Sequence, residues 1–201
     1  MEAAINRLTD AGIVDRTRVA VTGLSHGAEM VYYAISHTRL FRAAIASGPG
    51  WDPMLYDLTT DFFRAYSSTQ FGLESLTFDS HGQWARVSAA LNANRVRAPL
   101  LINAADSEYA YGMQFVTAIR DQKKPIEMFV YPDEAHVKNQ PMHRYEIYTR
   151  NVDWLRFWLQ DFEDPDPAKS DQYTRWRALR KLQSARGTEP VGAGEGFSKV
   201  H

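Results

Sequence analysis

Three side chains of this sequence could together carry out nucleophilic catalysis. Ser25 stands in the run Gly23-Leu24-Ser25-His26-Gly27, and Asp106 and His136 follow it along the chain. A serine hydroxyl is a weak nucleophile until a base removes its proton, and the base works best when a carboxylate orients it. We therefore take Ser25 as the candidate nucleophile, His136 as the candidate base and Asp106 as the candidate acid.

The residues around Ser25 predict a strand, a tight turn and a helix. The apolar, β-branched run 18–22 precedes the turn, and a helix-like run follows it and ends near His37. A Gly-x-Ser-x-Gly sequence in this setting is typical of the nucleophile elbow of α/β-hydrolases, in which the serine has strained backbone angles and the glycines relieve crowding. In such an elbow the backbone N–H of the next residue, here His26, is expected to be one donor of the oxyanion hole.

The order of the three residues along the chain matches the order that this fold requires. The acid should follow the second strand after the elbow strand, and the histidine should follow the next strand. We expect those strands at 99–104 and 125–131, with one more strand at 41–48. Asp106 comes just after the first of the two, with Glu108 as a nearby competitor. His136 comes after the last.

The remaining pattern predicts an α/β fold with about four parallel strands and flanking helices. Helices are expected at 2–11, 112–121 and 143–160, and a last helix after an N-cap at Asp166. The segment 51–94 favours short helices and loops, and within it Trp51 is the aromatic residue that best suits a place facing the site. Because the strands are parallel, the site should lie at their carboxyl ends.

The helix expected at 143–160 presents four apolar residues at helical spacing. A face made of these residues would be buried against the rest of the domain. They are Tyr148, Val152, Leu155 and Leu159.

Composition excludes several classes of function. The 201 residues have a net charge of −1, so nothing favours binding to nucleic acid or to an anionic membrane. The basic residues of the last helix are better explained as a solvated face. The absence of cysteine excludes disulfides and thiol catalysis. No apolar run is long enough to span a membrane and no signal peptide is recognisable, so we expect a cytoplasmic protein.

A metal site is the weaker interpretation of the residues near His136. Asp133, Glu134, His136 and His143 are clustered, but no two histidines have the spacing of a zinc-binding helix. We therefore expect neither a metal nor any other cofactor.

Three segments together resemble the catalytic domain of the prolyl oligopeptidase family of serine peptidases. They are GLSHGAEM, PLLINAADSEY and FVYPDEAH, and the resemblance extends over residues 12–160. The later stretch HVKNQPMHRYEIYTRNVDWLRFWLQ is similar to the lasso peptide isopeptidase branch of that family, whose members hydrolyse an isopeptide bond. The resemblance matches Ser25 to the nucleophile, Asp106 to the acid and His136 to the base. Ala28 stands where many members have a second glycine, a departure that the isopeptidase branch shares.

The resemblance also carries expectations about domains and partners. Family members have a β-propeller and a first half of the sheet, and that half supplies a second oxyanion donor. We therefore expect residues 1–185 to form a hydrolase domain without them. Independently of the resemblance, the glycine, proline and small polar residues of 186–201 predict a disordered tail. The expected partners are a peptide substrate and either the missing propeller or a second copy in a homodimer.

The sequence leaves three alternatives for the function. The first is a hydrolase of peptide or isopeptide bonds, with Trp51 and Glu108 as candidate substrate-binding residues. The second is an esterase of small acyl substrates that uses the same machinery. The third is a truncated, non-catalytic unit that binds peptide or dimerises.

Overall fold

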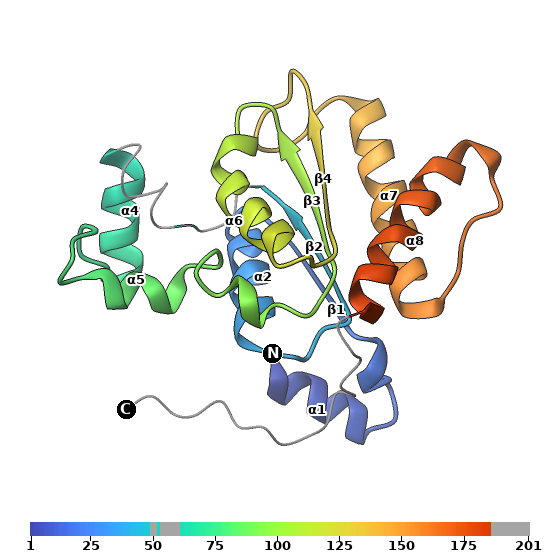
Figure 1. The fold of residues 1–201 in the computed structure, drawn as a ribbon, viewed down its shortest axis with the longest axis horizontal. Coiled ribbons are helices and arrows are strands. Elements are labelled where there is room, and N and C mark those ends of the chain that lie inside the picture. The colour runs from blue at the N-terminus through green and yellow to red at the C-terminus, as the bar shows by residue number, and fades with distance from the viewer. Residues whose placement is uncertain (49–51, 53–60, 186–201) are drawn as a thin grey trace.

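Four parallel strands form the centre of the molecule, as the sequence predicted. The structure is a computed structural model and describes residues 1–48, Asp52 and residues 61–185. The strands are β1 (Ala20–Leu24), β2 (Ala43–Ser47), β3 (Leu100–Ala105) and β4 (Ile126–Tyr131), and they lie side by side in chain order. Their carboxyl ends therefore lie along one edge of the sheet, at the top of Figure 1.

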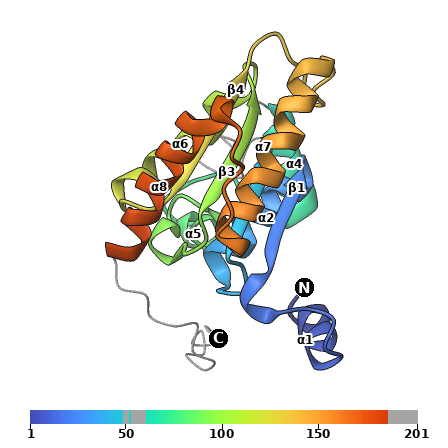
Figure 2. The ribbon, with the colours of Figure 1, turned by 90° about the vertical axis from the view of Figure 1, so that its right-hand side faces the viewer.

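Helices cover both faces of this sheet (Figures 1 and 2). On one face lie α2 (His26–His37) and α6 (Tyr109–Asp121), and on the other lie α7 (Pro141–Gln160) and α8 (Ser170–Ala185). Side chains of a strand alternate between the two faces, so Ala44 and Ala46 of β2 join the first core, whereas Ala43 and Ile45 join the second. Burial on both faces explains why the two central strands, β2 and β3, consist almost entirely of apolar residues.

The apolar face of α7 differs from the one expected from the sequence. Tyr148 and Val152 are 59% and 54% exposed, so that part of the prediction was wrong. The helix instead buries Ile147, Trp154 and Phe157. Trp154 packs edge-on against Trp176 of α8, and these large rings determine which side of the helix turns inward.

The other helices lie around the central sheet. The helix α1 (Glu2–Asp10) lies below it, and α4 (Asp61–Phe71) with α5 (His81–Val87) forms a lobe beside it (Figure 1). Short 3-10 turns occur at Arg16–Arg18, Ala93–Arg95 and Pro167–Lys169. None of the helices in the described ranges is both long and apolar enough to cross a membrane.

The α4–α5 lobe agrees with the short helices expected between 51 and 94. It has a small core of its own around Leu73 and Trp84. The predictions for Trp51 and for the tail 186–201 lie outside the described residues.

Candidate active site

Ser25 lies in a sharp turn between β1 and α2. Its backbone angles, φ 60° and ψ −126°, are rarely adopted by a residue with a side chain, and strain of this kind is common at functional sites. A Cβ atom on Gly23 would come within 2.1 Å of the carbonyl oxygen of Gly27, so only glycine allows the strand and the helix to approach this closely. The Ser25 backbone N–H donates to the Ser47 carbonyl at 3.0 Å and ties the turn to β2. The Ser25 side chain is exposed at the top of the sheet.

His136 lies in the loop after β4 and is hydrogen-bonded through Nδ1 to Glu108. The sequence favoured Asp106 as its partner and kept Glu108 as the competitor, and the structure pairs the histidine with Glu108. Glu108 is the N-cap residue of α6 and its side chain is only 13% exposed. A carboxylate on Nδ1 favours the tautomer in which Nδ1 carries the proton, and the lone pair of Nε2 then remains available as a base.

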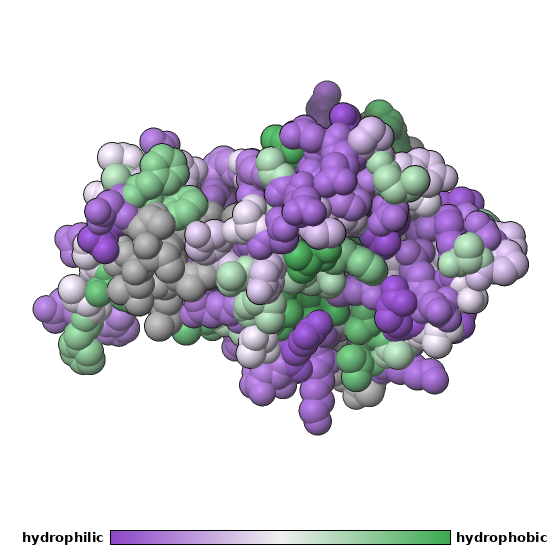
Figure 3. Space-filling view, turned by 90° about the horizontal axis from the view of Figure 1, so that it is seen from above, coloured by the Kyte–Doolittle hydropathy of each residue, from purple (hydrophilic) through white to green (hydrophobic). Residues whose placement is uncertain are grey.

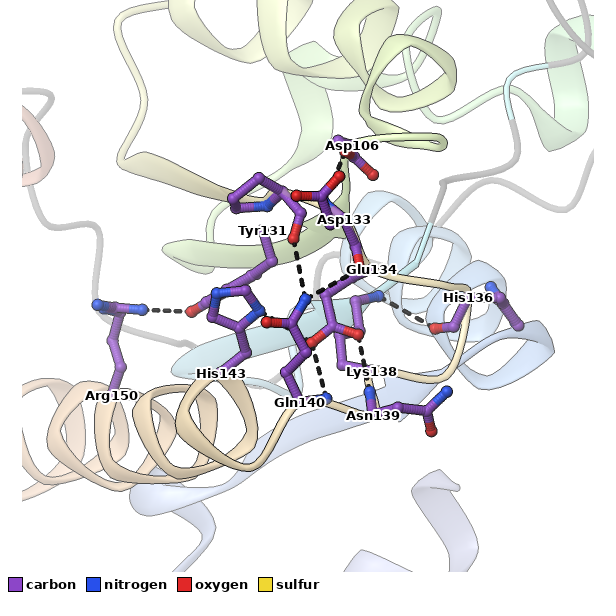
Figure 4. Close-up of polar contacts among 11 residues, drawn as sticks. Asp106, Tyr131, Asp133, Glu134, His136, Lys138, Asn139, Gln140, His143 and Arg150 are labelled. Carbon is purple, nitrogen blue, oxygen red and sulfur yellow. Dashed lines mark hydrogen bonds and ion pairs between the residues drawn. The ribbon is translucent and has the colours of Figure 1, made fainter.

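Asp106 joins the ends of two strands instead. Its backbone N–H donates to the Tyr131 carbonyl at 3.0 Å, and its Oδ2 accepts from the backbone N–H of Asp133 at 2.8 Å. Figure 4 shows this carboxylate turned towards Asp133. Because Asp106 sits directly at the strand end, its short side chain reaches the neighbouring strand end and not the histidine. Glu108 lies two residues further along the turn.

Gly48 shows how closely the histidine approaches the elbow. A Cβ atom built on Gly48 would lie 3.4 Å from Cε1 of His136 and 3.8 Å from the Cα of Ser25. Gly48 also has a φ of 122°, a backbone conformation that strongly favours glycine. The turn after β2 therefore leaves room for the imidazole beside the serine, and the structure brings Ser25, His136 and Glu108 to one place.

The loop that carries His136 is held from inside by Glu134. The Glu134 side chain is 1% exposed and accepts from the backbone N–H groups of Asn139 and Gln140, at 2.7 and 3.1 Å. It also lies 2.9 Å from Nδ1 of His143 (Figure 4). Burial alone would raise the pKa of Glu134, but these hydrogen bonds outweigh it and hold the pKa below its ordinary value. The loop is thus built around a buried carboxylate, a role the sequence did not indicate.

A second histidine, His26, directly follows the serine along the chain. Nδ1 of His26 lies 2.5 Å from Oε2 of Glu29, one helical turn further along α2, and 3.2 Å from the hydroxyl of Tyr66 on α4. The side chain of His26 is therefore engaged with the α4–α5 lobe. Its backbone N–H lies at the N-terminus of α2, where N–H groups point out of the helix. The spacing of His26 and Glu29 could have predicted the first contact, but nothing local predicts Tyr66.

A pocket lies behind the elbow, between β1 and α7. Its volume is about 410 Å³, and it is lined by residues of β1, the histidine loop and α7, among them Leu24, Lys138 and Tyr148. Leu24 and Val137, the neighbours of Ser25 and His136, are 46% and 56% exposed. Figure 3, which looks onto the top of the molecule as drawn in Figure 1, shows hydrophobic residues gathered near the middle of this face. In the described ranges no cluster of three or more metal-binding side chains occurs.

Comparison with known proteins gives the site a family context. The sequence profile of the prolyl oligopeptidase family matches residues 1–162. Among curated proteins, the lasso peptide isopeptidase AtxE2 of Asticcacaulis excentricus is 40% identical over 183 residues, which are 91% of this chain and 26% of that protein. Acylamino-acid-releasing enzyme 2 of Oryza sativa subsp. japonica is 27% identical over 76% of this chain and 21% of its own length.

Solved structures agree with these sequence matches. The apo AtxE2 isopeptidase superimposes with a TM-score of 0.83 over 90% of this chain and 28% of that one. An acylaminoacyl peptidase of Pyrococcus horikoshii, at 19% identity, has a TM-score of 0.67 over 82% of this chain and 28% of its own, and supports the fold alone. The chain spans about a quarter of the length of the curated relatives it matches.

Proposed function

Because the chain belongs to the prolyl oligopeptidase family, we propose that it carries the catalytic centre of a serine peptidase that cleaves peptide or isopeptide bonds. The observation that carries the proposal is the meeting of a strained Ser25 with the His136–Glu108 pair at the carboxyl ends of parallel strands. Of the two carboxylates near the site, Glu108 is the better candidate for the acid, because its side chain contacts the imidazole.

The proposed reaction has two stages. Nε2 of His136 takes the proton of the Ser25 hydroxyl while Oγ attacks the carbonyl carbon of the substrate. The tetrahedral intermediate then expels the amine, which receives that proton from His136, and an acyl-enzyme on Ser25 remains. Water attacks the acyl group with His136 again acting as the base, and the proton returns to Ser25. Glu108 holds the imidazole and stabilises its charged form throughout.

The negative charge that develops on the substrate carbonyl needs hydrogen-bond donors. The backbone N–H of His26 is suitably located for one of them, at the N-terminus of α2, where the helix dipole also favours negative charge. Removing one donor of an oxyanion hole typically lowers the rate by about 10²–10³-fold.

The isopeptide bond of a lasso peptide is the substrate favoured by the comparison with AtxE2. In such a substrate the acyl group transferred to Ser25 would be the side-chain carbonyl of an acidic residue, and the leaving group would be an N-terminal amine. The hydrophobic surface around Leu24 and Val137 is suited to apolar side chains of a peptide.

The proposal is tested by treating the folded protein with a fluorophosphonate probe. We expect covalent labelling of Ser25 in the wild type, none in Ser25→Ala, and unchanged labelling in Ser68→Ala, which removes an exposed serine from α4. Absence of labelling in a folded wild-type protein would refute the proposal and favour a non-catalytic peptide-binding unit.

The substrate class needs a second measurement. We expect incubation with a threaded lasso peptide to give a product heavier by one water. Hydrolysis of p-nitrophenyl esters without turnover of either the lasso peptide or linear peptides would point to an esterase instead.

A further inference from the structure

Lys138 is a buried cation in contact with both halves of the His136–Glu108 pair. Its side chain is only 4% exposed, which is rare for lysine unless it is paired. Nζ donates to the backbone carbonyl of His136 at 3.2 Å and lies 3.7 Å from Oε2 of Glu108. Figure 4 shows the side chain folded back beneath the loop towards that carbonyl.

The two oxygens of Glu108 have different surroundings. Oε1 is hydrogen-bonded to Nδ1 of His136, whereas Oε2 is buried and has no hydrogen-bond partner among the described residues. A buried carboxylate oxygen without a partner is costly unless a positive charge lies near it. Lys138 supplies that charge, so removing it would leave His136 as the sole close cationic partner of Glu108 within the described contacts.

Other charged groups of the site are already engaged or lie on other elements. Glu134 acts electrostatically on Lys138 and is itself bound to His143, and Arg144 of α7 lines the same pocket as Lys138. The Asp106 carboxylate accepts from the backbone N–H of Asp133 at the start of the loop. Burial lowers the pKa of Lys138, while Glu108 and Glu134 oppose that effect. Among the described residues, the cationic side chain in contact with the Glu108 carboxylate, apart from His136, is Lys138.

We propose that Lys138 is a positioning residue that fixes the main chain of His136 and the carboxylate of Glu108, and whose charge sets the pH range in which His136 can act as a base. This inference rests on the proposed function of His136. A positive charge next to Glu108 offsets the pull of that carboxylate on the imidazolium, so it keeps the imidazole neutral to lower pH.

The test replaces Lys138 with methionine, which keeps the length of the side chain and removes its charge. We expect Lys138→Met to raise the pKa of His136 by about one unit, measured by NMR titration of the histidine ring, because one charge is lost a few Å from the pair. The acidic limb of the pH profile of kcat/KM, or of probe labelling, should move up by the same amount. Lys138→Arg should keep both values within about a third of a unit of the wild type, since it retains the charge.

A matched control separates this effect from the loss of an ion-paired lysine in general. Lys169 forms ion pairs with Asp153 and Asp164 near the start of α8, away from the serine. Lys169→Met should lower the melting temperature without moving the pKa of His136. An unchanged pKa of His136 in folded Lys138→Met would overturn the inference and reduce Lys138 to a structural contact.

The remaining outcomes are also decisive. If Lys138→Met does not fold, Lys138→Gln provides the neutral variant, and failure of both would show that the cation serves the fold and not the histidine. The NMR titration does not depend on turnover. If Lys138→Met shifts the pKa of His136 as expected but the wild-type protein is not labelled at Ser25, only the proposed function is refuted.

Discussion

Two histidine–carboxylate pairs lie near Ser25, and they are assembled in different ways. His26 and Glu29 are three residues apart on α2, so one turn of helix is enough to bring them together. His136 and Glu108 are 28 residues apart and come from loops after two different strands. The first pair is local, and the second depends on the register of the sheet.

This difference matters for which pair could act on the serine. The side chain of His26 is directed to Glu29 and to Tyr66 on α4, so this pair links the elbow to the α4–α5 lobe. The ring of His136, in contrast, lies beside Gly48 and the elbow. The His136–Glu108 pair is also held in place by the sheet, because Asp106 joins the ends of β3 and β4, which precede Glu108 and His136. The comparison predicts that the distant pair performs the chemistry and the local pair supports binding.

The largest expected difference is between the two histidines. His136→Gln should lower kcat by on the order of 10⁶-fold, the size of the loss when a serine peptidase is deprived of its base. His26→Gln should lower it by less than about tenfold, because the backbone N–H, which is the expected oxyanion donor, is retained. Steady-state kinetics on one peptide substrate measures both, and comparable losses in the two variants would remove the distinction between the pairs.

The second difference is between the two carboxylates after β3. Glu108→Gln should lower kcat by about 10⁴-fold, because an amide no longer favours the productive tautomer of His136. Asp106→Asn should cost about tenfold or less, since an amide oxygen can still accept from the backbone of Asp133. Melting temperatures provide the control for folding. The reverse order of the two losses would restore Asp106 as the acid.

The sequence predicted the location of this site but not all of its contacts. Alternating strands and helices, with chemistry-bearing residues after particular strands, are enough to bring Ser25, His136 and the β3 turn together. Whether Asp106 or Glu108 reaches the imidazole depends on the path of a short turn and on side-chain length. Periodicity does not encode either property.

The same limit explains the other differences between expectation and structure. On α7, apolar residues occur on more than one side, and the fit of Trp154 against Trp176 on α8 decides which side is buried. Lys138 is buried and contacts Glu108, and Tyr66 contacts His26; in both cases the partner is distant in the chain. Neither has a local motif that could have revealed it.

The smallest expected effect concerns the link between the local pair and the lobe. The hydroxyl of Tyr66 lies within hydrogen-bond distance of His26. Burial and the nearby Glu29 raise the pKa of Tyr66 above its ordinary value, which keeps this hydroxyl protonated further into the alkaline range. A hydrogen bond of this kind contributes about 0.5–1.5 kcal/mol, which corresponds to at most about tenfold in an equilibrium constant. If α4 contacts the bound substrate, Tyr66→Phe should therefore raise KM for a peptide by a few fold and leave kcat nearly unchanged.

Tyr33→Phe is the matched control, because it removes a hydroxyl from the exposed side of α2 where the ring stacks on His37. It should leave both constants unchanged. If α4 binds one side of the substrate, the rise in KM for Tyr66→Phe should grow with the length of the peptide and vanish for a small ester. A fall in kcat of a hundredfold or more would instead mean that the local pair takes part in the chemical step. The assignment of the chemical step to His136 and of substrate binding to His26 would then be wrong.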